Sequence, residues 1–161
     1  MAYLERFVAF SLLNEESSKS LQRIKSAYMR TLGLHSGDAM LLAVLSEHEE
    51  GLSAAALSRA CKLDRAAISR ALPALLAEGV IAYAEDHAQK RNYRSRLVLT
   101  EKGKETVKKI QVFTVDTVRR TSEDIESEEL ATFYRVFRTI ERRLADHAAA
   151  LENADEERKE S

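Results

Sequence analysis

Apolar and polar positions along the chain predict a series of helices with one change of period in the middle. From residue 3 to residue 32 there is no Pro or Gly, and apolar residues recur at helical spacing. This predicts one long helix, broken near Asn14 and ended at Gly33. Ser36 is placed to cap a second helix, which Gly51 ends.

Two shorter helices follow in close succession. Ser53 is placed to cap a helix that runs to about Cys61. Asp64 is placed to cap another helix that runs to Glu78 and is ended by Gly79. Two helices joined by a tight turn are the outline of a helix-turn-helix.

The hydrophobic period then changes from helical to alternating. Apolar residues alternate over residues 80–85 and 96–100, on either side of a polar loop, which predicts a β-hairpin. A hairpin directly after a helix-turn-helix is a wing. Its tip gathers the basic residues Lys90, Arg91, Arg94 and Arg96 around Tyr93.

Two further helices are predicted, one from Thr100 to about Ser122 and one capped by Ser127. The last helix carries apolar residues in a 3-4 alternation like the seam of a coiled coil, and the acidic tail after Glu152 is expected to fray. The seam residues are Leu130, Phe133, Phe137, Ile140, Leu144, Ala148 and Leu151.

The outer helices carry apolar residues on more than one face, which one small domain cannot bury. We therefore expect a homodimer, with an intramolecular bundle of the same helices as the alternative. The residues concerned are Phe7, Phe10, Leu13, Val107, Val112, Phe113, Val115 and Val118.

The composition favours a helical protein of one domain, spanning residues 1–161. The chain is 45% hydrophobic and 32% charged, with one Pro and five Gly. Its single cysteine, Cys61, has no partner for an internal disulfide, and neither a secretory signal nor a bilayer-spanning apolar run is evident. We expect a cytoplasmic location.

The charges are unevenly spread. The net charge is −1, but residues 53–103 hold nine Lys/Arg against five Asp/Glu. A basic centre between acidic flanks suits a surface that faces phosphates, although an ordinary solvated face would look the same.

The segment from Leu52 to Gly103 resembles the MarR family of bacterial transcriptional regulators. The matching runs are Leu52-Ser53, Ala56-Leu57, Asp64-Arg65-Ala66-Ala67-Ile68-Ser69-Arg70, Leu75-Leu76-Ala77-Glu78-Gly79-Val80-Ile81 and Leu99-Thr100-Glu101-Lys102-Gly103. The resemblance implies a mainly α fold with a small β-hairpin wing, an α+β winged helix-turn-helix. Residues 1–33 and 104–152 would then be dimerisation helices, and residues 36–103 the DNA-binding part.

The helix after Asp64 is the expected recognition helix. Arg65 and Arg70 are the candidates for guanine contacts, Ser69 for a base edge or phosphate, and Ala66 is small enough to allow close approach. Solvent-facing salt bridges are the alternative role of both arginines. Pro73 lies inside this helix, where it removes a backbone hydrogen bond and risks a kink or a shortened helix.

The other candidate contacts are to phosphates or the minor groove. Ser53 would hold a phosphate at a helix N-terminus, and the four basic residues at the tip of the wing would follow a phosphate ridge or enter the minor groove. The wing lacks the Asp-x-x-Asp-Arg-Arg pattern of many family members, so individual wing contacts do not carry over from the family.

The resemblance implies a repressor, less often an activator, that is relieved by a small aromatic or phenolic ligand and binds a pseudo-palindromic operator on double-stranded DNA. Leu34, His35 and Met40 are the residues expected to border the ligand cleft. A winged-helix module that binds an acidic protein is one alternative, and a redox-sensing regulator that uses Cys61 is another. No catalytic constellation, cofactor motif or zinc-ligand spacing is evident, so we expect neither an enzyme nor a metal site.

Overall fold

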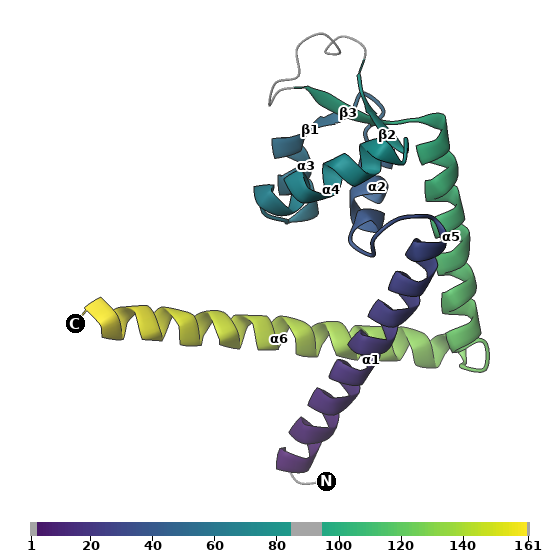
Figure 1. Ribbon diagram of the computed structural model, residues 1–161. Coiled ribbons are helices and arrows are strands. Elements are labelled where there is room, and N and C mark those ends of the chain that lie inside the picture. Colours follow the sequence, from purple (N-terminus) through teal and green to yellow (C-terminus); the bar gives the residue numbers. More distant parts are fainter. Residues whose placement is uncertain (1–2, 85–94, 161) are drawn as a thin grey trace. The chain divides into compact units, whose positions relative to one another are not determined.

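The computed structural model describes residues 3–84 and 95–160. The mainly α fold with a small β-sheet is confirmed (Figure 1). In chain order the elements are α1 Tyr3–Thr31, α2 Asp38–Ser46, β1 Leu52–Ser53, α3 Ala54–Cys61, α4 Arg65–Ala77, β2 Ile81–Tyr83, β3 Arg96–Leu99, α5 Glu101–Ser122 and α6 Ser127–Glu160. They form two compact units, Met1–Thr114 and Val115–Ser161.

The first unit holds the hydrophobic core. Helix α3 packs against α2 and α4, and β3 packs against α2. Within this unit the ring of Tyr28 on α1 stacks on the ring of Phe113 on α5, with the centroids 3.7 Å apart, and the Tyr28 hydroxyl donates to the carbonyl of Lys109. The core residues are Met29, Leu34, Leu41, Leu42, Leu45, Leu57, Ile68, Leu75, Val80, Ile81, Leu97 and Val107.

The capping residues of the helix-turn-helix lie where the sequence predicts them. The Ser53 hydroxyl accepts from the backbone N–H of Ala56 at 3.2 Å, and the Asp64 carboxylate accepts from Ala67 N–H at 2.6 Å. Gly79, with φ of +66°, ends the turn after α4. Side-chain caps satisfy backbone donors that the first helical turn leaves unpaired, and so fix where α3 and α4 begin.

The wing hairpin is confirmed, and it is joined by a strand that the sequence pattern did not predict. The three antiparallel strands lie in the order β1-β3-β2. Leu52 and Ser53 of β1 pair with Leu97 and Arg96 of β3. Strand β1 thus ties the start of α3 to the wing.

Three predicted helix boundaries are wrong. Helix α1 runs through Asn14 without a break, because an exposed polar residue in a long helix costs little. Helix α6 continues past Glu152 to Glu160. Helix α2 ends at Ser46, and Gly51, with φ of +76°, instead closes the turn into β1.

The predicted cap of α2 is also wrong. Gly37, not Ser36, is the N-cap, and no side-chain cap bond forms there. Instead the buried carboxylate of Asp38, in the first turn, accepts from the backbone N–H of His35 at 2.7 Å. A carboxylate in the first turn can replace an N-cap side chain, because it satisfies a free backbone N–H and lies at the positive end of the helix dipole.

Pro73 does not shorten the predicted recognition helix, since α4 continues to Ala77. The carbonyl that loses its partner belongs to Ser69, and Ser69 is exposed, so water is available to it.

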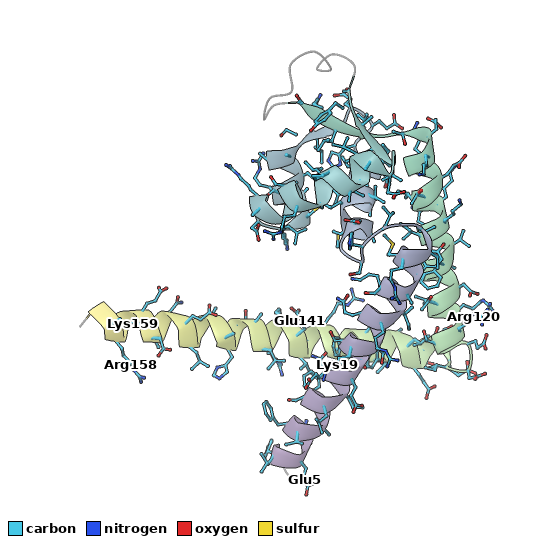
Figure 2. All side chains as sticks on the ribbon, in the orientation of Figure 1. Glu5, Lys19, Arg120, Glu141, Arg158 and Lys159 are labelled. Carbon is cyan, nitrogen blue, oxygen red and sulfur yellow. The ribbon has the colours of Figure 1, made fainter. Side chains whose placement is uncertain are left out.

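The second unit contains the end of α5 and the long helix α6. Asp116 accepts from Arg119 at 2.7 Å and from Arg120 at 2.6 Å, and these bonds lower the pKa of its carboxyl group. Side chains project from α6 along its length (Figure 2), and the seam residues Phe133, Ile140, Leu144 and Leu151 are exposed. No described helix is long and apolar enough to cross a membrane.

The segment Leu99-Thr100-Glu101-Lys102-Gly103 fastens the start of α5 to the end of α4. The Thr100 hydroxyl donates to the carbonyl of Gly79 at 2.6 Å and accepts from Gly103 N–H at 3.0 Å, while Thr100 N–H donates to Val80. A Cβ atom at Gly103 would overlap the Val80 carbonyl oxygen. Glycine at this position is therefore a requirement of backbone packing.

We predict that Gly103→Ala lowers the free energy of unfolding by about 1–3 kcal/mol, the usual cost of overpacking. Gly37→Ala is the matched control, because a Cβ there meets nothing within 4 Å and its φ of −71° suits any residue. Urea unfolding followed by circular dichroism measures both. Equal stability of the two variants would contradict the proposed packing.

Candidate nucleic-acid interface

Helix α4 has one buried face and one exposed face. Ile68 is 1% exposed and Leu75 is fully buried. Residues Arg65, Ala66, Ser69 and Arg70 are exposed. Burial of two branched side chains at about 1.5–3 kcal/mol each fixes the rotation of α4 about its axis. The four residues of α4 that are predicted to contact DNA therefore share the outer surface of the helix.

The surface of the helix-turn-helix is basic. Arg59 at the end of α3 and Lys62 in the turn are exposed and join Arg65 and Arg70. Within the described ranges none of these four cations has an ion pair. The one acidic residue of α3, the turn and α4 is Asp64, whose carboxylate caps α4. Repulsion among unpaired like charges suits a surface that meets an anionic partner.

Sequence reasoning missed Arg59 and Lys62. Both residues contribute to the basic charge of residues 53–103, which is the signal that could have found them.

The fold brings Ser53 and Arg96 together. They are partners in the β1–β3 register, and side chains of directly opposite residues in an antiparallel pair lie on the same face of the sheet. Arg96 also forms an ion pair with Glu50, in which Nη1 of Arg96 and Oε2 of Glu50 are 3.5 Å apart and both side chains are exposed. Such an exposed pair contributes little and exchanges readily, so it leaves Arg96 available to a phosphate beside the α3 N-terminus.

The remaining predicted wing contacts, Lys90, Arg91 and Arg94, lie outside the described residues, as does Tyr93. Arg96 is the one predicted wing contact in the part of the chain that the structure describes.

The three predicted ligand residues lie in different environments. Leu34 is buried in the core, whereas Met40 is 56% exposed and the His35 side chain is exposed. His35 Nδ1 lies 3.6 Å from the carboxylate of Asp38. Of the three, His35 and Met40 have surface to offer a ligand.

Cys61 is a partly buried thiol at the end of α3. Burial raises its pKa. A raised pKa lowers the thiolate fraction at neutral pH, which is the opposite of what a reactive cysteine needs. The described residues also hold no group of three or more His, Cys, Asp or Glu side chains that could bind a metal ion.

Comparison with known proteins gives one family match and several solved structures of similar fold. Residues 32–91 match the model of the MarR family. No curated protein matches the chain in sequence.

Several solved structures share the fold. A MarR family transcription regulator is 22% identical with a TM-score of 0.77, over 90% of this chain and 94% of its own. Staphylococcus aureus MepR, solved as a DNA complex, is 18% identical with a TM-score of 0.67, over 84% of this chain and 96% of its own. Bacillus subtilis YusO is 15% identical with a TM-score of 0.68, over 88% of this chain and 99% of its own.

The resemblance seen in the sequence is thus confirmed: residues 32–91 match the MarR family model, and the chain has the winged-helix fold of solved MarR family transcription regulators.

Proposed function

We propose that this chain is a cytoplasmic, sequence-specific regulator of transcription that binds double-stranded DNA as a homodimer. The observation that carries the proposal is the exposed face of α4, on which Arg65, Ala66, Ser69 and Arg70 are exposed while Ile68 and Leu75 are buried. A helix with this division fits the major groove, which admits an α-helix with its side chains against the base edges.

Each residue on that face has a distinct role in the proposal. Arg65 and Arg70 donate paired hydrogen bonds to guanine O6 and N7, and Ser69 contacts a base edge or phosphate. Ala66 allows the helix to approach the bases. Phosphate contacts from Ser53, Arg96 and the wing residues Lys90, Arg91 and Arg94 set the register of the helix without reading sequence.

The dimer is proposed from the exposed apolar residues of the outer helices. On α1, Phe7 and Leu13 are exposed, and on α6 so are Phe133, Leu144 and Leu151. Removing such side chains from water is the main driving force for association. A twofold dimer presents two recognition helices about one turn of DNA apart, which fits a pseudo-palindromic operator.

The regulator is proposed to act as a repressor that a small aromatic or phenolic ligand relieves. A ligand that binds the DNA-incompetent dimer more tightly shifts the population toward it. Leu34, His35 and Met40 are the candidate contacts, and of these the side chains of His35 and Met40 are exposed. The proposal involves no catalysis and no cofactor.

Arg70→Ala is expected to weaken binding to the specific operator by roughly 1–3 kcal/mol for each half-site and to relax discrimination at one base pair. The control is Arg142→Ala, which removes an exposed arginine from α6 outside the proposed interface. Fluorescence anisotropy on an operator selected from genomic fragments measures both. An equal loss of affinity on every sequence would assign Arg70 to the phosphate backbone, and an unchanged affinity would remove it from the interface.

Leu144→Asp is expected to convert the dimer to a monomer, because it places a charge on the apolar seam of α6. Ala149→Asp adds the same charge to an exposed position outside the seam and should leave the dimer intact. Sedimentation velocity separates the two species. A Leu144→Asp protein that sediments like the wild type would contradict the proposed use of the seam.

The raised pKa of Cys61 gives a test of the redox alternative. At pH 7 the thiol is expected to react with iodoacetamide more slowly than free glutathione, and Cys61→Ser is expected to bind DNA like the wild type after peroxide treatment. Faster alkylation, together with a peroxide response that Cys61→Ser loses, would favour the redox alternative.

A further inference from the structure

The turn of the helix-turn-helix has an unusual backbone position. Four described residues adopt a left-handed conformation, and three of them are glycines: Gly33, Gly51 and Gly79. The fourth is Lys62, with φ of 53° and ψ of 38°. This conformation is unfavourable for a residue with a Cβ atom, and glycine is the usual choice.

The conformation of Lys62 is imposed by the way α3 ends. Lys62 N–H donates to the Arg59 carbonyl at 3.2 Å, and Leu63 N–H donates to the Ser58 carbonyl at 3.0 Å. The Ser58 hydroxyl closes the turn by donating to the Leu63 carbonyl at 2.7 Å. This is a Schellman ending, in which the residue that Lys62 occupies must be left-handed. Any residue at position 62 therefore meets the same constraint.

A lysine at such a position has a side chain that the fold does not use. Lys62 is exposed and forms no ion pair with any described residue. It lies three residues before Arg65, the first residue of α4, and close in sequence to the exposed Arg59. The turn thus presents a cation beside the end of the helix that is proposed to enter the major groove.

We propose that Lys62 binds a phosphate of the DNA backbone and so sets the depth and angle at which α4 enters the groove. The inference rests on the proposed function and deepens it, since it names a contact that orients the reading helix. An ammonium group serves as a point charge on a phosphate without requiring a fixed hydrogen-bond geometry. Because phosphate contacts carry no sequence information, Lys62 strengthens binding to every duplex.

The test compares the full-length protein with Lys62→Gly, Lys62→Gln and Lys62→Arg. The Gly variant removes the charge and suits the left-handed turn, so its melting temperature should equal or exceed that of the wild type. Its affinity should fall roughly three- to tenfold on operator and random duplexes alike. The slope of log affinity against log salt should become shallower by about 0.9 for each chain of the dimer.

The Arg variant should keep the affinity and the salt slope of the wild type. The Gln variant should show the same fall in affinity and the same shallower slope as the Gly variant. Lys25→Gln removes the same charge from an exposed position on α1 and should change neither. An unaltered salt slope in Lys62→Gly and Lys62→Gln would overturn the inference, whatever the affinity. A wild-type protein without salt-dependent affinity for any duplex would instead overturn the proposed function itself.

Discussion

Burial of Ile68 and Leu75 on one side of α4 is the constraint on which the proposed interface depends. These two side chains lie in the core formed with α2 and α3, where each is at most 1% exposed. Because residues on a helix have fixed angular relations, burying one face determines which side chains face outward. The same packing that stabilises the first unit therefore directs Arg65, Ser69 and Arg70 toward solvent. Stability and proposed recognition are two consequences of one arrangement.

The two ends of α4 are held by different means. At its N-terminus the Asp64 cap and the Schellman turn at Lys62 fix the backbone, while the basic side chains remain unpaired among the described residues. At its C-terminus, Thr100 joins the Gly79 carbonyl to the first turn of α5, and the close approach of Gly103 to Val80 leaves no space between them. These contacts couple the start of α5 to the end of α4, so we expect a displacement of one to move the other.

The sequence predicted best what depends on near neighbours. Ser53 and Asp64 cap helices as expected, because a cap bond spans only three residues. The errors at Asn14, Ser36 and Glu152 concern helix ends, where weak local preferences yield to length and to competing acceptors such as the Asp38 carboxylate. Strand β1 was missed because two residues are too few to show an alternation of apolar and polar positions. Its pairing with β3 is also set by contacts with residues more than forty positions away in the chain. For the same reason the pairing of Ser53 with Arg96 could not be predicted, although each residue was singled out alone.

The central claim is that the exposed face of α4 contacts guanines in the major groove. Methylation interference tests it most directly, because dimethyl sulfate modifies guanine N7, the acceptor proposed for Arg65 and Arg70. Modified guanines should block binding in two clusters about one helical turn apart, and the Arg70→Ala protein should become insensitive at one position in each cluster. Binding that tolerates N7 methylation throughout the operator would contradict the account.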